Sequence, residues 1–314
     1  MSHAVADIEC PLRAPVAVFC RTLEGNPYAL HPIQFSYIGG PGADSKENKA
    51  DMNLLLTNDD GIFAPGLQAL HQRLASRHDV AVVAPDQERS AVGHGITLHH
   101  PLRASQVALN AHFHGYAVNG TPADCIKLGM VELLAMRPDL VLSGINPGAN
   151  VGVNVNYSGT VAAAKEAALL GLPAIAVSVQ GRNVVNYEAA AAFAESLAET
   201  VVRQGLPRGT FLNVNIPNVP FTDISGTVVS RQGTGMYADR FEKRRDPRDR
   251  TYYWPGSDPQ VFDDDPEVDG AALQGNFISI TPIKCDMTDY DALERLRHWR
   301  WDTACSGLPG RGQS

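Results

Sequence analysis

The sequence predicts an α/β protein with a doubly wound, mostly parallel, Rossmann-like sheet. The first observation is that short, continuous apolar runs of strand length alternate with longer segments of helical periodicity. The second is that each apolar run stops at turn residues, which is typical of parallel strands buried on both faces. The third is size: with 314 residues, 44% of them apolar, the chain can bury a large core.

The expected elements follow in order from residue 53. Strands are predicted at 53–57, 80–84, 140–143, 174–179 and 211–216, and helices at 65–77, 122–136, 160–170 and 187–204. The helix at 65–77, for example, carries Leu67, Leu70 and Leu74 along one face, behind a proline near its start. After Pro217 the alternation stops. Strand-like runs remain at 227–231 and 277–281, and a short helix at 289–300 closes the fold.

Four segments are expected along the chain. Residues 1–51 are broken by prolines and end in a polar run, so they predict a poorly ordered N-terminal extension. Residues 52–220 form the Rossmann-like catalytic core, 221–300 the C-terminal strands and an extended arm packed on the core, and 301–314 a frayed tail. The long polar stretch between the last two strands has two interpretations, an extended β-hairpin arm that grips another subunit or a solvated surface loop.

The composition excludes several classes of protein. Lys and Arg number 26 against 34 Asp and Glu, a formal net charge of −8, which argues against a nucleic-acid polymer as partner. No apolar run approaches the roughly 18–20 residues that span a bilayer, and the first residues lack the positive charge of a secretory signal. The five cysteines show no CxxC spacing, so neither a disulfide framework nor a zinc cluster is indicated. A cytoplasmic enzyme with no membrane partner is expected.

Two adjacent carboxylates follow the first predicted strand. In an open α/β sheet, ligands collect beyond the carboxyl ends of the strands. Asp59 and Asp60 can converge only if the chain turns there, and Gly61 permits that turn. Two carboxylates held together stay ionised most readily around a divalent cation. The alternative is an Asx turn that caps the next helix, a frequent use of Asn-Asp-Gly.

Oxygen donors follow two further strands. Ser90 lies in the polar loop after the strand at 80–84, and Asn146 follows the strand at 140–143. Parallel strands deliver these groups to the same edge of the sheet as the two carboxylates. An all-oxygen donor set with two carboxylates suits one Mg²⁺ or Mn²⁺ ion, whereas zinc prefers His or Cys. The alternative is that Ser90 and Asn146 are ordinary turn residues.

A fourth segment, at residues 157–161, enters the alanine-rich helix. Ser158 at a helix start normally caps a free backbone amide. The same amides, with the positive end of the helix dipole, also form an anion site, and Gly159 allows an anion to approach the backbone closely. Beside a metal ion, this arrangement predicts a phosphate group.

These segments resemble the SurE family of metal-dependent nucleotidases. The matching motifs are residues 55–61 (LLTNDDG), 83–90 (VAPDQERS), 119–125 (NGTPADC), 143–150 (SGINPGAN), 157–164 (YSGTVAAA), 212–217 (LNVNIP) and 279–282 (SITP). The resemblance covers about residues 52–300. Four positions depart from the family pattern, none of them a predicted ligand: Phe63 stands where His is usual, Gly95 where Ser is usual, Pro147 where Arg is common and Lys165 where Met is common.

The resemblance implies particular roles for the site residues. Asp59, Asp60, Ser90 and Asn146 would hold the metal ion, and Asn150, Ser158, Gly159 and Thr160 would bind the phosphate. Asp59, Asp60, Asn150, Ser158 and Thr160 would form the catalytic set. The implied activity is hydrolysis of nucleoside 5′- and 3′-monophosphates, with short polyphosphate as a further substrate of some members. The implied assembly is a homodimer or homotetramer through the C-terminal arm.

The sequence leaves two points open. No general acid for the leaving oxygen is evident, and His94 is a candidate by residue type alone. A non-catalytic nucleotide- or metal-binding regulatory protein on the same fold is the alternative to a phosphatase, because fold alone does not fix function. The complete ligand set favours the phosphatase.

Overall fold

The computed structural model describes residues 52–110, 113–184, 186–234, 240–256, 265 and 267–299. The expected extension at 1–51 and the expected tail at 301–314 lie outside the described residues. The strands are β1 Asn53–Thr57, β2 Asp79–Pro85, β3 Ala104–Asn110, β4 Phe113–Val118, β5 Leu140–Pro147, β6 Ala174–Val179, β7 Thr210–Ile216, β8 Gly226–Val229, β9 Arg240–Arg245, β10 Thr251–Gly256 and β11 Phe277–Lys284. The α-helices are α1 Pro65–Leu74, α2 Pro122–Leu128, α3 Gly159–Leu169, α4 Tyr187–Gln204, α5 Asp269–Gln274 and α6 Tyr290–Arg297.

Nine of these strands form one sheet in the order β3-β4-β2-β1-β5-β6-β7-β11-β8. The central strands, from β4 across to β7, run parallel to their neighbours. The antiparallel pairs lie toward the edges, where β3 pairs with β4 and β11 with β7. The prediction of a doubly wound, mostly parallel sheet is confirmed. The C-terminal strands β11 and β8 continue this same sheet.

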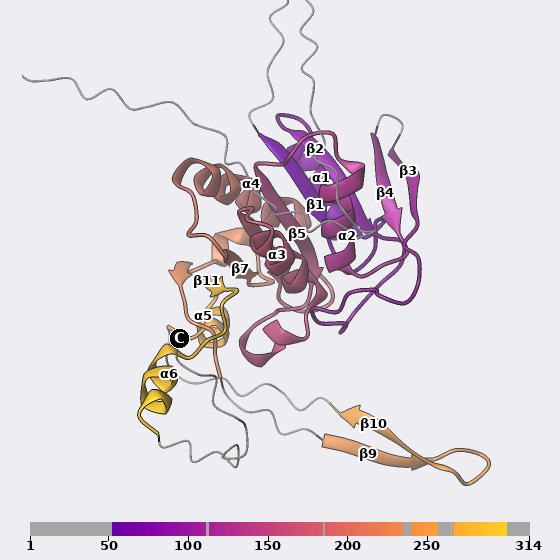
Figure 1. Ribbon diagram of the computed structural model, residues 1–314, viewed down its shortest axis with the longest axis vertical. Helices are drawn as coiled ribbons and strands as arrows, with labels where there is room; N and C mark the ends of the chain where they lie inside the picture. Colours follow the sequence, from indigo (N-terminus) through magenta and orange to yellow (C-terminus); the bar gives the residue numbers. More distant parts are fainter. Residues whose placement is uncertain are drawn as a thin grey trace, which may run out of the picture. The chain divides into compact units, whose positions relative to one another are not determined.

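Alternation of side chains along the central strands creates two separate cores. Leu54 and Leu56 of β1 pack with the leucines of α1 and the alanines of α4 on one face of the sheet. Leu55 points the other way and packs with α2 and with the alanines of α3. Helices therefore cover both faces, and every residue from Leu54 to Leu56 is almost completely buried (Figure 1). This explains why the predicted strands are continuous apolar runs.

The structure differs from the sequence prediction in several elements. The predicted helix at 122–136 is α-helical only to Leu128 and continues as one π-helical turn, Gly129–Leu133. Strand β5 extends to Pro147, past the predicted end at residue 143. The hairpin of β3 and β4 and the short helix α5 have no counterpart in the prediction. Since β3 is an edge strand with mostly exposed or half-buried side chains, it lacks the continuous apolar run that marks the central strands.

A second, two-stranded sheet lies within the predicted C-terminal arm. Strands β9 and β10 pair antiparallel, with Arg240 opposite Gly256 and Arg245 opposite Thr251. Every residue of both strands is exposed. The predicted β-hairpin is thus present. In the described part of the chain, no helix combines the length and the apolar composition needed to cross a membrane.

Candidate functional site

The turn after β1 carries the two predicted carboxylates. Gly61 adopts a φ of 101°, a left-handed conformation that glycine tolerates and that lets the chain reverse there. The Asn58 side-chain amide donates to the Gly61 carbonyl over 2.9 Å and closes the turn. Helix α1 begins at Pro65 without a side-chain cap. The turn is therefore closed by the Asn58 side-chain nitrogen and is not an Asx turn, in which the side-chain oxygen would accept a backbone amide; Oδ1 of Asn58 accepts none, and no side chain caps α1.

Asp59 lies in contact with the first turn of α3. Asp59 is only 5% exposed to solvent. Its Oδ1 accepts a hydrogen bond from the Thr160 hydroxyl over 2.5 Å. A Cβ atom on Gly159 would lie 2.7 Å from the Asp59 Cβ, so only glycine leaves room for this carboxylate. Burial raises the pKa of the Asp59 carboxyl, and the hydrogen bonds from Thr160 and Gly159 act against that rise.

Asp60 supplies the feature most indicative of a cation. Its Oδ2 is buried and has no hydrogen-bond partner, and the same holds for Oδ1 of Asn58 in the same turn. Burial, together with the charges of Asp59 and Glu88, raises the pKa of the Asp60 carboxyl to about 7. A buried oxygen without a donor is costly unless a cation or a proton compensates it. Orphaned oxygens beside two carboxylates match the chemistry of a hard divalent cation.

Ser90 lies on the loop after β2, next to this turn. The Arg89 amide donates to the Asp59 carbonyl over 2.7 Å, which fixes the loop against the end of β1. The Ser90 side chain is exposed, and its hydroxyl donates to Oε1 of Glu88 over 2.6 Å. The lone pairs of that hydroxyl remain available to a cation. Sequence reasoning did not single out Glu88, whose charge acts on Asp60 and whose carboxylate holds Ser90.

Asn146 lies near the end of β5, the strand that pairs with β1 on the side away from β2. Ser143 of β5 is the register partner of Thr57, so Asn146 and Asp60 each follow the same register pair by three residues. The Asn146 amide nitrogen donates to the Gly148 carbonyl over 2.6 Å. Because the nitrogen is used in this turn, the oxygen is the side-chain atom left to act as a ligand.

Asn150 belongs to a different set of contacts, with strands β6 and β7. Its backbone amide donates to the Asn215 side chain over 2.7 Å, and its carbonyl accepts from Asn213 and Asn215 over 2.7 and 3.1 Å. Its side-chain nitrogen donates to the Ser178 hydroxyl over 2.9 Å. The two asparagines of β7 therefore fix the loop that carries Asn150. The sequence signal was the Asn-Val-Asn run, in which both polar side chains point to one face of a buried strand.

The hydroxyls of Ser158 and Thr160, which are predicted to bind phosphate, already have hydrogen-bond partners within the protein. Ser158 is the N-cap of α3, where its Oγ accepts from the Val161 amide over 3.1 Å. The Thr160 hydroxyl is committed to Asp59. The first amides of α3 are directed at the same carboxylate. The structure thus joins Asp59, Asp60, Gly159 and Thr160 in one cluster, attaches Ser90 through its loop, and holds Asn150 in its own network.

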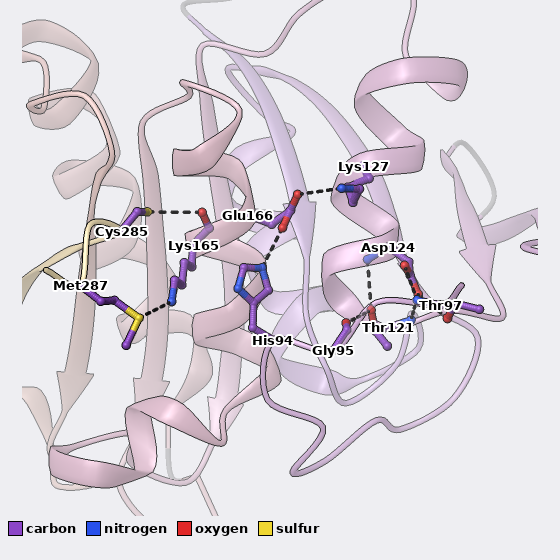
Figure 2. Close-up of polar contacts among 10 residues, drawn as sticks. All are labelled: His94, Gly95, Thr97, Thr121, Asp124, Lys127, Lys165, Glu166, Cys285 and Met287. Atoms are coloured by element: carbon purple, nitrogen blue, oxygen red, sulfur yellow. Dashed lines mark hydrogen bonds and ion pairs between the residues drawn. The ribbon is translucent and has the colours of Figure 1, made fainter. Parts of the chain in front are cut away.

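His94 lies on the loop that follows Ser90. Its Nε2 is 2.7 Å from Oε2 of Glu166, a buried residue on α3, and Glu166 also pairs with Lys127 over 3.4 Å (Figure 2). The hydrogen bond with His94 is the largest of the influences that lower the pKa of Glu166. The loop is further anchored where the Gly93 amide donates to the Tyr157 carbonyl and the Thr121 hydroxyl to the Gly95 carbonyl. The imidazole is therefore held in one orientation.

A second group of ligand-type residues occurs between α1 and α4. Ligand atoms of His78, Glu195 and Glu199 lie within 4.8 Å of one another, a spacing compatible with a metal ion. Both glutamates are paired with arginines, Glu195 with Arg73 over 2.6 Å and Glu199 with Arg77 over 3.0 Å. The guanidinium groups supply positive charge that a cation would otherwise bring, while both ring nitrogens of His78 and Oε1 of Glu195 are buried without a hydrogen-bond partner, with His78 Nε2 3.6 Å from that oxygen.

Known proteins resemble this chain over most of its length. A family model described as survival protein SurE matches residues 54–239. A protein named 5′-nucleotidase SurE from Desulfatibacillum aliphaticivorans is 55% identical over 249 residues, which is 79% of this chain and 98% of that protein. One of the same name from Geobacter sulfurreducens is 49% identical over 249 residues, 79% of this chain and 94% of that protein. The crystal structure of a SurE protein from Aquifex aeolicus superposes with a TM-score of 0.66 at 39% identity, covering 78% of this chain and 98% of that one.

Proposed function

The chain belongs to the SurE family, and we propose that it is a nucleotidase that hydrolyses nucleoside monophosphates with one divalent ion, Mg²⁺ or Mn²⁺, per subunit. Relatives at 55% and 49% identity carry the name 5′-nucleotidase. The observation that carries the proposal is the turn after β1, where two adjacent carboxylates meet the N-terminus of a helix and one of them keeps a buried oxygen without a partner.

The proposed ligands are the oxygens of Asp59, Asp60, Ser90 and Asn146. A divalent ion held there would lower the pKa of a bound water and neutralise charge on the phosphoryl group. Asn58 holds the turn that presents the two carboxylates, and Thr160 fixes the orientation of Asp59.

The phosphoryl group is proposed to lie beside the first turn of α3. The positive end of the helix dipole stabilises negative charge at such a position, whereas the first amides of α3 are already directed at Asp59 and Ser158. Gly159 and Ser158 would present this backbone to the substrate, and Asn150 would contribute from its fixed loop. Water attacks phosphorus in line with the leaving oxygen, which departs with the nucleoside and takes up the proton that the water releases.

We extend the proposal to both the 5′- and the 3′-monophosphate and to short polyphosphate as a further substrate. A site built on a cation and the positive end of a helix dipole contacts the phosphoryl group and makes few demands on what that group is attached to. The family resemblance in the sequence points the same way.

The test is phosphate release from 5′-AMP, 3′-AMP and tripolyphosphate, with Mn²⁺, with Mg²⁺ and after treatment with EDTA. The wild-type protein is expected to release phosphate only with a divalent ion. Asp59→Asn and Asp60→Asn should each reduce this release to background while the far-UV circular dichroism spectrum remains that of the wild type. Asp291→Asn, an exposed carboxylate on α6, serves as the matched control and should retain full activity.

Two outcomes would contradict the proposal. One is wild-type activity in Asp59→Asn. The other is a folded wild-type protein that binds Mn²⁺ and AMP but releases no phosphate, which would favour a non-catalytic nucleotide-binding protein on this fold.

A further inference from the structure

A cavity of about 130 Å³ runs along one face of α3. Ser158, Val161, Ala162 and Lys165 line it, and this spacing is that of one helical stripe two turns long. Two turns of helix correspond to about 10 Å. The cavity therefore begins at the N-cap of α3, where we place the phosphoryl group, and ends at Lys165. Its far wall comes from the end of β11 and the segment that follows.

The charged groups that line this cavity are all basic. They are Lys165 of α3 and Lys284 at the end of β11, and the imidazole of His94 lies in the same lining. The nearby carboxylate of Glu166 is bound to His94 and Lys127 (Figure 2). Asp286, outside the lining, accepts hydrogen bonds from Tyr290 and from the Thr288 amide, and these bonds, with a smaller effect from the charge of Lys284, lower the pKa of its carboxyl.

The two lysines have only weak partners in the protein. The Lys165 ammonium contacts the Met287 sulfur over 3.5 Å, and the Lys284 ammonium lies 5.3 Å from the centre of the Tyr290 ring (Figure 2 shows the first contact). In the described part of the chain neither ammonium lies within ion-pair distance of a carboxylate, although the charge of Lys284 acts on Asp286 from farther away. Each ammonium can donate three hydrogen bonds, so most of this capacity is available to a ligand. A cavity with two such groups and no acid in its lining favours an anion.

We propose that this cavity binds a second phosphate group carried by the substrate, and that nucleoside bisphosphates are therefore preferred over nucleoside monophosphates. This inference rests on the proposed nucleotidase function, because it places the scissile phosphate at the N-terminus of α3. Water attacks that phosphorus, the bond to the ester oxygen breaks, and the ester oxygen takes up the proton released by the water. The products are inorganic phosphate and a nucleoside monophosphate, whose remaining phosphate is held between Lys165 and Lys284.

The test compares adenosine 3′,5′-bisphosphate with 5′-AMP and 3′-AMP. In hydrolysis assays with Mn²⁺, the wild type should show a kcat/KM for the bisphosphate at least tenfold above that for either monophosphate. Lys165→Met and Lys284→Met keep most of the side-chain volume and remove the charge. Each variant should lower the ratio of kcat/KM for the bisphosphate to kcat/KM for either monophosphate about tenfold. A loss of this size is expected when one hydrogen bond to a charged group is removed. Arg203→Met, which removes a positive charge from α4 on the opposite face of the sheet, should leave the ratio unchanged.

Calorimetric titration of the bisphosphate in EDTA provides a readout that does not depend on turnover. The wild type should bind the bisphosphate, and the double variant Lys165→Met/Lys284→Met should bind it at least tenfold more weakly. Binding that depends on the lysines, in a protein without phosphatase activity, would overturn the proposed function and support the cavity. This inference alone would be overturned if the wild type hydrolysed AMP and the bisphosphate with equal kcat/KM and the lysine variants changed neither value. Lysine-dependent binding of tripolyphosphate without binding of the bisphosphate would overturn the assignment to nucleosides.

Discussion

At the scale of single residues, the site depends on how Asp59 is held. A buried carboxylate needs donors, and Asp59 receives them from the Thr160 hydroxyl and from the first amides of α3. These contacts orient one carboxylate oxygen toward the helix. Removing a group that orients a metal ligand in this way commonly lowers metal affinity by about 10–100-fold. The sequence predicts that Thr160 contacts the phosphate. The structure shows that its hydroxyl also orients the Asp59 carboxylate.

Thr160→Val tests this role. Valine keeps the shape of the side chain, so the buried site should remain filled, but Asp59 loses its shortest hydrogen bond. The affinity for Mn²⁺, measured by calorimetric titration, is expected to fall by about 10–100-fold. Thr160→Ser restores the hydroxyl and should bind Mn²⁺ nearly as the wild type does. Equal affinity in the valine variant would show that the hydroxyl does not support the metal site.

Gly159→Ala tests the close approach of α3 to the same carboxylate. The new methyl group would lie 2.7 Å from the Asp59 Cβ and 2.9 Å from its Oδ2, closer than such atoms pack, so Asp59 must move. The expected result is a loss of stability of about 1–3 kcal/mol, together with a loss of Mn²⁺-dependent activity. Thermal unfolding and the phosphate-release assay measure the two effects.

Gly129→Ala is the matched control for that variant. Gly129 has an ordinary helical φ of −55°, and its nearest neighbour would be 3.4 Å from the new methyl group, an ordinary contact distance. This substitution should leave activity unchanged. If both alanine variants retained full activity, the contact between Gly159 and Asp59 would not constrain the site.

How far the site could be predicted depends on whether its contacts are local in sequence. Asp59, Asp60 and Gly61 are consecutive, so the turn and its carboxylates followed from the sequence. The hydrogen bond of Thr160 to Asp59 joins residues 101 positions apart, and no pattern at either position reveals it. Glu88 shows the same limit, because only the fold shows that its charge acts on Asp60.

At the scale of elements, α2 is fixed at its start by a capping box that also holds the His94 loop. The Thr121 side chain accepts from the Asp124 amide, and the Asp124 carboxylate accepts from the Thr121 amide over 2.9 Å. The same carboxylate accepts from the Thr97 hydroxyl over 2.6 Å and from the Thr97 amide over 3.0 Å (Figure 2). One buried carboxylate thus joins the helix to the loop that carries His94.

Asp124→Asn tests this junction through its pH dependence. Burial alone would raise the pKa of Asp124, but the hydrogen bonds from Thr97 and Thr121 outweigh it and hold the pKa below 3.8. A carboxyl with a lowered pKa in the folded state stabilises the protein above the pKa of the unfolded state. That contribution is lost as the pH falls through the folded pKa. At pH 7 the variant should be about 1–2 kcal/mol less stable than the wild type, and the difference should shrink below pH 3.8.

Urea unfolding at a series of pH values measures that difference. Asp291→Asn, an exposed first-turn carboxylate of α6, should show little change at any pH. A difference between Asp124→Asn and the wild type that stayed constant from pH 7 to below 3.8 would show that the charge of Asp124 is not what stabilises the junction.

The elements themselves were predictable where burial alone decides the pattern. The long helix α4 has the predicted bounds of 187 and 204, because its alanines and its charged residues alternate at helical spacing. The hairpin of β3 and β4 was not predicted, since its outer strand buries little and pairs through its backbone. The π-helical turn after Leu128 was not predicted either, because the apolar residues keep their helical spacing through it and Gly129 at its start is tolerated in either kind of helix.

At the scale of the whole molecule, the hairpin of β9 and β10 has no core of its own subunit to pack against, because every residue of both strands is exposed. A two-stranded hairpin is at best marginally stable by itself in water. This one exposes Phe241, Tyr252, Tyr253 and Trp254, with exposed fractions between 39% and 62%. Its register puts Tyr253 opposite Lys243 and Trp254 opposite Glu242, so aromatic side chains occur on both faces. Exposed aromatic side chains in this number are typical of an interface between proteins.

The last prediction is that this hairpin holds a homodimer or homotetramer together. Light scattering on the wild type should give two or four times the chain mass of 33.7 kDa. Serine substitutions on one face, Phe241→Ser with Tyr253→Ser, and on the other, Tyr252→Ser with Trp254→Ser, remove apolar area from each face in turn. Because burial of such area drives association, at least one pair should raise the dissociation constant at least tenfold. Leu98→Ser, which removes an exposed apolar side chain outside the hairpin, should leave the mass unchanged. A wild-type mass of 33.7 kDa, or association unaffected by either pair, would favour the other interpretation of the sequence, a solvated surface loop.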